Sequence, residues 1–224
     1  MFLQEVFDLL RNGELSQLSI GGYEAGFISR ANQEKVIPHI NLGLSAIYQR
    51  FPLKEIRVSF NLVPNSYRYT LKVDDINKIE RVFTDSDYEL TLNNEIDPYT
   101  IRTPSLKTLV VPSDIVNTVT TLPDELVTSA IEVIYRASHP KLIAEDPDLD
   151  PDELQLELPY THLQALILFV AARMHTPAGS GQFEGIIGNM YYQRYEAAMQ
   201  ELEGLNPQVE LTAKNARLHQ KGWA

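Results

Sequence analysis

Residues 41–62, NLGLSAIYQRFPLKEIRVSFNL, contain a change of hydrophobic period at Pro52. Before this proline, apolar residues recur at steps of three and four, as they do on one face of a helix. After it, apolar and polar residues alternate, which is typical of a strand with one buried face. The stretch therefore predicts a helix that leads directly into a β-sheet.

The helix before Pro52 carries its apolar stripe at Val36, Ile37, Ile40, Leu44, Ile47, Tyr48 and Phe51. Asn32 is suited to cap its first turn, because an Asn side chain can accept a hydrogen bond from a free backbone N–H. Pro38 lies inside the pattern and has no N–H, so we expect it to kink the helix or delay its start. Further upstream, apolar residues within positions 2–10 predict a short helix, and four glycines within positions 12–30 predict a loop.

The strand after Pro52 has Ile56, Val58, Phe60 and Leu62 on one face. A turn at residues 64–66 and a second alternating run at residues 67–73 follow it, so the pair predicts a β-hairpin. Turn residues separate the later apolar runs. Short strands are therefore expected near residues 79–83, 88–92, 106–111 and 129–137.

Residues 144–153, AEDPDLDPDE, predict an acidic loop whose prolines and charges cannot build a core. An apolar stripe from Leu163 to Met174 predicts a helix that begins near Pro159. A second helix is expected to end at Gly204. Its apolar residues are Phe183, Ile186, Ile187, Met190, Tyr191, Tyr195, Ala198 and Leu202.

The predicted helices precede and follow the strands instead of alternating with them, which indicates an α+β fold. We expect a small helical bundle made of residues 1–52 and 154–204, with an antiparallel β-sheet region inserted at residues 53–140. Residues 141–153 would form the acidic loop, and residues 205–224 an extended C-terminal arm.

The composition argues against a protein that grips nucleic acid. The chain has 30 acidic and 19 basic residues, a formal net charge of −11, whereas such a grip needs clustered Lys and Arg. It has no cysteine, so disulfides are impossible. The N-terminus lacks the pattern of a signal peptide, and the longest apolar run, residues 165–172, is too short to span a bilayer. We expect a soluble protein that assembles in a reducing cytoplasm.

No catalytic signature is present, and neither a cofactor nor a metal site is predicted. The five histidines (His39, His139, His162, His175 and His219) match no zinc-protease spacing, and we expect them at the surface or at helix ends. The sequence Gly179-Ser180-Gly181 lacks the frame of a hydrolase nucleophile and is interpreted as a turn.

The most specific candidate for an ion site is the alternating row Asp146, Asp148, Asp150 and Asp152. In an extended chain these carboxylates would point the same way and could attract calcium. Pro147 and Pro151 stand where a calcium loop needs backbone donors and glycine. A solvated linker is therefore the favoured interpretation.

Gly185 and Gly188 lie inside the last predicted helix, where each costs about 1 kcal/mol relative to alanine. A helix keeps such glycines where a neighbour must approach closely. That neighbour could belong to the same bundle or to the next subunit, and the sequence favours neither.

The C-terminal arm has no acidic residue after Glu210 and contains Lys214, Arg217, His219 and Lys221. It also contains Trp223, the one tryptophan of the chain, a residue type enriched at binding hot spots. The arm therefore predicts a docking segment, with Arg217, His219, Lys221 and Trp223 as its contacts. The alternative is a frayed terminus.

Three stretches resemble the head-to-tail adaptor proteins of tailed bacteriophages. They are Asn41–Glu55 at the end of the second helix, Ile134–Pro140 in a late strand, and Asn215–Trp223 at the C-terminus. None of them is a catalytic motif. The resemblance implies a structural virion protein and not an enzyme.

The resemblance also implies a ring, commonly of twelve copies, that joins the portal protein to a tail or nozzle protein in the neck. DNA would pass through the ring without sequence-specific binding, the arm would dock on the portal, and the sheet side would receive the tail. Assembly would take place in the bacterial host cytoplasm, with no membrane partner. The alternatives are another neck ring, a gatekeeper or tail terminator, and a hydrolase of cell-wall sugars that uses two carboxylates.

Overall fold

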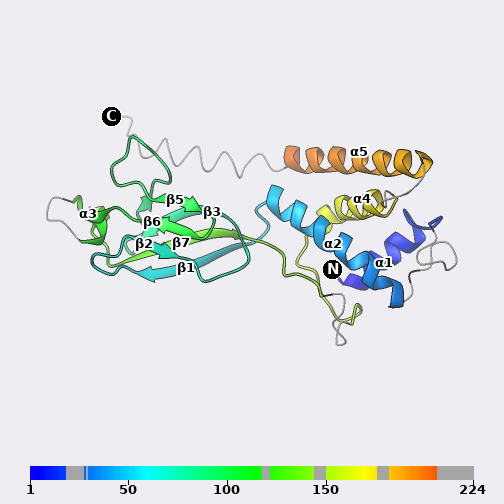
Figure 1. The fold of residues 1–224 in the computed structure, drawn as a ribbon, viewed down its shortest axis with the longest axis horizontal. Coiled ribbons are helices and arrows are strands. Elements are labelled where there is room, and N and C mark those ends of the chain that lie inside the picture. Colours follow the sequence, from blue (N-terminus) through cyan, green and yellow to red (C-terminus); the bar gives the residue numbers. More distant parts are fainter. Residues whose placement is uncertain (19–27, 29, 118–121, 144–149, 176–181, 206–224) are drawn as a thin grey trace. The chain divides into compact units, whose positions relative to one another are not determined.

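A computed structural model describes residues 1–18, 28, 30–117, 122–143, 150–175 and 182–205. The chain divides into two compact units. The helical unit comprises Met1–Ile47 and Lys141–Ala224, and the sheet unit comprises Tyr48–Pro140. Helices and antiparallel sheets are both present, so the expected α+β fold class is confirmed (Figure 1).

The helical unit is built around a central helix that is apolar on nearly all sides. Its elements are α1 (Leu3–Asn12), α2 (Arg30–Arg50, whose last turn belongs to the sheet unit), the 3₁₀ turn η2 (Tyr160–His162), α4 (Leu163–Met174) and α5 (Gln182–Leu205). Most of α4 is buried, as expected for a helix surrounded by others. Figure 1 shows α4 between α2 and α5.

The start of α1 is fixed by the end of the acidic loop and the residue that follows it. The first N–H groups of a helix have no partner within the helix. Here the Leu3 N–H donates to the Leu154 carbonyl (2.9 Å) and the Gln4 N–H donates to the Pro151 carbonyl (3.0 Å). The Phe2 N–H donates to the Glu5 carboxylate (3.2 Å). Pro151, near the end of the predicted acidic loop, is itself buried.

Two antiparallel sheets share one apolar core in the sheet unit. One sheet has the order β1-β7-β3-β4 and the other β2-β6-β5. The strands are β1 (Glu55–Asn61), β2 (Arg68–Thr70), β3 (Ile76–Thr84), β4 (Glu89–Leu90), β5 (Arg102–Ser105), β6 (Thr108–Val110) and β7 (Ala130–Ala137). Two short helices, α3 (Ser113–Val116) and η1 (Asp124–Leu126), lie between β6 and β7.

The predicted hairpin of residues 56–62 with residues 67–73 is wrong. Val58 of β1 lies opposite Val133 of β7, and Tyr69 of β2 lies opposite Leu109 of β6, so the two runs belong to different sheets. They still face the same core, where the rings of Phe60 and Tyr69 are 6.4 Å apart. Alternation predicted the buried faces of the strands but not their partners.

Candidate functional site

The longest helix of the described residues, α5, has two sides of different character. Its inner side packs on α4 through Tyr195, Met199 and Leu202, all of which are buried. The Tyr195 ring meets the Phe169 ring of α4 edge-on, with centroids 5.2 Å apart. This contact fixes which side of α5 faces away from the bundle.

One stripe of its exposed side, here called the α5 outer face, carries no charged residue. It consists of Ile186, Asn189, Met190, Gln193, Ala197, Gln200 and Gly204. At about 100° per residue these positions lie in one stripe along the helix. The exposed side of a helix in water normally carries charged residues. This stripe carries none, although the exposed Arg194 and Glu201 lie beside it.

Two large apolar side chains mark the N-terminal half of the α5 outer face. Ile186 and Met190 are each 58% exposed. The sequence lists both among the apolar residues of this helix, but in the structure they lie outside the core. The physical reason is that the helical period fixes relative directions only, and α5 packs on α4 through the opposite side, at Tyr195 and Met199.

The two glycines proposed for close packing, Gly185 and Gly188, are neighbours on α5 but differ in exposure, since Gly185 is half-buried. Gly188 is buried. A Cβ added at Gly185 would meet no described atom within 4 Å outside its own stretch of chain. Nothing described in the helical unit therefore requires glycine at position 185, and close approach of another copy there remains a prediction.

A third helical glycine makes a close approach that the sequence analysis missed. Gly43 lies in α2, and a Cβ at this position would stand 2.7 Å from Leu166 Cδ1 and 3.1 Å from Phe169 Cδ1 of α4. The signal that could have found it is the one applied to Gly185 and Gly188, a glycine in the interior of a strongly predicted helix.

The described histidines of the helical unit serve packing. His162 and His175 are buried at the two ends of α4. His175 Nε2 lies 3.1 Å from the Glu14 carbonyl oxygen, and its ring stacks on Tyr191 of α5 at a centroid distance of 5.2 Å. Burial lowers the pKa of His39 and of His162, and for His39 the nearby Arg173 lowers it further.

The acidic row is only partly described, since Asp146 and Asp148 lie outside the described residues. Asp150 is engaged locally: its carboxylate accepts from the Asp152 N–H (3.1 Å) and its carbonyl accepts from the Leu154 N–H (2.9 Å). Across the described parts of the chain, no cluster of three or more His, Asp or Glu is placed to hold a metal ion.

The predicted docking contacts Arg217, His219, Lys221 and Trp223 also lie outside the described residues. Within residues 1–205, excluding the gaps given above, no helix is both long enough and apolar enough to cross a bilayer.

Comparison with known proteins identifies the family. The family model of SU10 adaptor protein matches residues 3–218, nearly the whole chain. No curated protein matches the chain. The match confirms the resemblance to phage head-to-tail adaptors that three short stretches had suggested. Since it spans far more than half of the sequence, this protein belongs to the SU10 adaptor protein family.

Proposed function

We propose that this adaptor forms a ring in the neck of a tailed phage, where it joins the portal of the head to the tail and surrounds the DNA channel. Membership of the adaptor family supports a structural role in the phage particle. The ring, its twelve copies, its place in the neck and the portal partner are the proposal.

The main observation that supports a ring is the exposed, uncharged α5 outer face. A closed ring needs a heterologous contact, in which one surface of a subunit meets a different surface of the next. The α5 outer face supplies the first surface, because Ile186 and Met190 lie exposed on a stripe without charges. We infer that the second surface lies on α1 and α2, where Leu9 and Leu42 are 46% and 47% exposed.

The C-terminal arm supplies the contact to the portal in this proposal. Lys214, Arg217 and Lys221 make it basic in a chain whose formal net charge is −11. Attraction to an acidic surface would speed the encounter, and burial of Trp223 would slow dissociation.

The same net charge suits a channel through which DNA passes without adhering. A duplex is held by many Lys and Arg contacts to phosphate, and acidic residues outnumber basic ones here by 30 to 19. Twelve copies would carry a formal charge of about −132. This excess would repel DNA enough to prevent adhesion.

Assembly on purified portal rings tests the proposal. Ile186→Glu together with Met190→Glu places two charges on the α5 outer face without touching the packed side of α5. We expect the wild-type chain to fill each portal with a complete ring, and the double variant to leave incomplete rings in electron micrographs.

The matched control is Ile96→Glu in the sheet unit, because Ile96 is 93% exposed and lies between β4 and β5. This variant should assemble as the wild type does. Complete rings of the Ile186→Glu, Met190→Glu variant would show that the α5 outer face is not the ring contact.

A further inference from the structure

The strand β1 has one open edge. It ends the four-stranded sheet, and among the described strands it pairs with β7 alone. In this ladder the Leu62 N–H donates to the Ser129 carbonyl and the Ala137 N–H donates to the Lys54 carbonyl, both at 2.8 Å. Hydrogen-bonded and non-bonded pairs alternate along an antiparallel ladder. The backbone groups of four residues therefore point away from β7: Glu55, Arg57, Ser59 and Asn61.

The strand β2 is open in the same way. It ends the three-stranded sheet, and of the strands in the described part of the chain it pairs only with β6. The Val111 N–H donates to the Tyr67 carbonyl (2.9 Å), and the Leu71 N–H donates to the Lys107 carbonyl (2.8 Å). By the same alternation, two residues of β2 direct their backbone groups to the open edge: Arg68 and Thr70.

The edge of β1 lacks the usual features that keep other strands away. Natural edge strands are often short, bulged or interrupted by proline. β1 is seven residues long, pairs with β7 without a bulge and contains no proline. Its charged residues, Glu55 and Arg57, pair with charged residues of the same sheet. Ile56, Val58 and Phe60 pack on the core but stay partly exposed, so an added strand would cover them.

The open edges of β1 and β2 complement each other in one antiparallel register, in which Val58 lies opposite Tyr69. Residues that lie opposite each other share a face of the sheet. On the core side, this register also sets Ile56 opposite Leu71, so apolar residues meet there. On the outer side, the open backbone groups of the two strands meet. The outer pairs are Glu55 with Lys72, Arg57 with Thr70, and Ser59 with Arg68.

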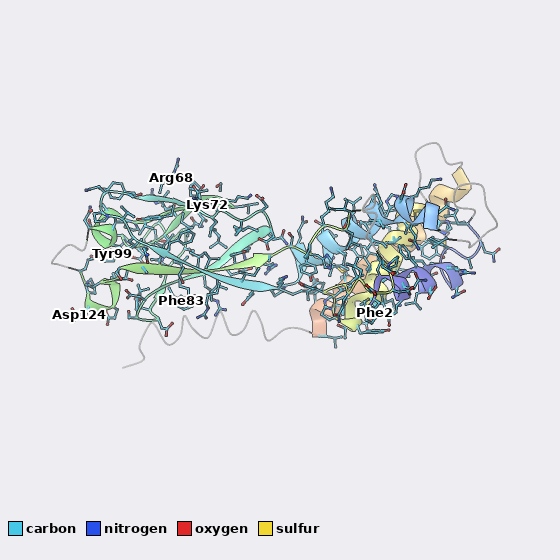
Figure 2. The ribbon with its side chains drawn as sticks, turned by 90° about the horizontal axis from the view of Figure 1, so that it is seen from below. Phe2, Arg68, Lys72, Phe83, Tyr99 and Asp124 are labelled. Atoms are coloured by element: carbon cyan, nitrogen blue, oxygen red, sulfur yellow. The ribbon has the colours of Figure 1, made fainter. Side chains whose placement is uncertain are left out.

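Charge favours this register over its neighbours. It sets the Lys72 ammonium group beside the Glu55 carboxylate. A shift by two residues is the smallest that keeps apolar residues on the core side. Such a shift sets Arg57 opposite either Arg68 or Lys72, and like charges in opposite positions destabilise a strand pair. Among the described residues, Arg68 and Lys72 form no ion pair, and Figure 2 shows both on the same side of the sheet unit.

The two complementary edges lie on one chain but end different sheets, and they do not pair with each other within the described structure. A ring requires two different surfaces of a subunit that fit each other. We propose that β1 of each copy pairs with β2 of the next copy, so that the four-stranded sheet of one copy continues into the three-stranded sheet of its neighbour. This inference rests on the proposed function, because it assumes the ring, and it adds a second contact to that of the α5 outer face.

Engineered disulfides test the inference, because the chain has no cysteine of its own. Ser59 and Arg68 are exposed and lie opposite each other in the proposed pair. The Cα atoms of such a pair stand about 5.5 Å apart, a separation that a disulfide bridges. Rings of the variant Ser59→Cys, Arg68→Cys on purified portals should give a ladder of cross-linked oligomers after oxidation. With the two substitutions on separate copies, the mixture should give dimers only.

Two further changes in the double-cysteine chain separate strand pairing from mere proximity. The Thr70 N–H points to the open edge, so Thr70→Pro removes a donor to the neighbour without removing a bond to β6. It should lower the yield of the ladder at least about tenfold while the midpoint of chemical unfolding stays near that of the parent. Lys72→Glu should lower the yield about twofold to fivefold, and Glu55→Lys added to it should restore the yield.

The matched control is Ser59→Cys with Ser105→Cys. Ser105 is exposed on β5, at the opposite edge of the three-stranded sheet, and this variant should give no ladder. Complete rings without a ladder, a disulfide within one chain, or dimers of the double variant that do not extend to longer oligomers would overturn the inference and leave the proposed function intact. Absence of wild-type rings on the portal would overturn the proposed function and this inference with it.

Discussion

Gly43 of α2 lies so close to Leu166 of α4 that a Cβ at position 43 would stand 2.7 Å from Leu166 Cδ1. Leu166 is fully buried, and Phe169 crowds the same position at 3.1 Å. The two helices can therefore approach at this point only with glycine in α2. Through this contact, residues 41–62 pack directly against α4, the central helix of the bundle.

Gly43→Ala should destabilise the chain although alanine favours a helix. We expect a loss of about 1–2 kcal/mol in the free energy of unfolding, because overpacking of Leu166 and Phe169 outweighs the gain in helix propensity. The matched control is Gly185→Ala in α5, where a Cβ meets nothing described, and which should stabilise by about 0.5–1 kcal/mol. Chemical denaturation measures both. A more stable Gly43→Ala variant would contradict the close contact.

Acidification should destabilise the helical unit through His39 and His162. Burial lowers the pKa of both below the ordinary value of 6.5, so the unfolded chain takes up protons before the folded chain does. Stability is therefore complete above pH 6.5 and declines as the pH falls below it. Asp74 and Asp85 also have lowered pKa values, but their contribution is lost only in stronger acid, below their ordinary value of 3.8.

Denaturation at pH 7.5 and at pH 5.5 checks this window. The variant His39→Gln, His162→Gln should lose less stability between the two values than the wild type. An equal loss in both proteins would assign the pH dependence to other groups.

The ion pair between Arg136 and Glu80 should stabilise the sheet unit more than the exposed pairs do. Arg136 Nη2 lies 2.7 Å from Glu80 Oε1, the two side chains are only 15% and 18% exposed, and Arg136 Nη1 also donates to the Gln49 carbonyl (3.1 Å). Arg136→Met removes this partner from the Glu80 carboxylate, which is largely shielded from solvent. The substitution should lower the free energy of unfolding by about 2–3 kcal/mol.

Arg57→Met is the control for that pair, because the Arg57 side chain is 59% exposed in its contact with Glu132. It should cost less than about 1 kcal/mol. Similar losses of stability in the two variants, measured by chemical denaturation, would show that burial does not strengthen the Arg136 pair.

The sequence predicted the fold class because its period changes at Pro52, and α2 does end just before it, at Arg50. It did not predict the start of α2. Pro38 was expected to kink the helix or delay its start, and the start is not delayed, because α2 begins at Arg30 and includes Pro38. Pro38 and Glu34 are both exposed, so water can reach the Glu34 carbonyl that loses its helical partner.

The pairing of the strands and the exposure of the α5 outer face could not be predicted from the sequence, because local patterns do not specify packing partners. Alternation in β1 indicates which side is buried, but its partner β7 begins at residue 130, and no local pattern encodes that pairing. In α5, the period groups Ile186 with Met190 but cannot tell whether that side meets α4 or another molecule. Packing within the bundle decides it.

Deletion of residues 206–224 should separate folding from docking. The buried cores of both units are built from residues before 206, so we expect the free energy of unfolding to change by less than about 0.5 kcal/mol. Binding to portal rings should be lost. The single substitution Trp223→Ala should weaken binding by tenfold or more, about 1.4 kcal/mol, as removal of a hot-spot anchor does. Unchanged portal binding of the truncated chain would remove the docking role of the arm.

Electron microscopy of phage particles that carry a tagged copy of this chain tests the central claim most directly. The account predicts extra density arranged as a ring between the portal and the tail, with one tag for each of about twelve copies. Tags inside the head, along the tail, on side fibres, or absent from the particle would contradict it.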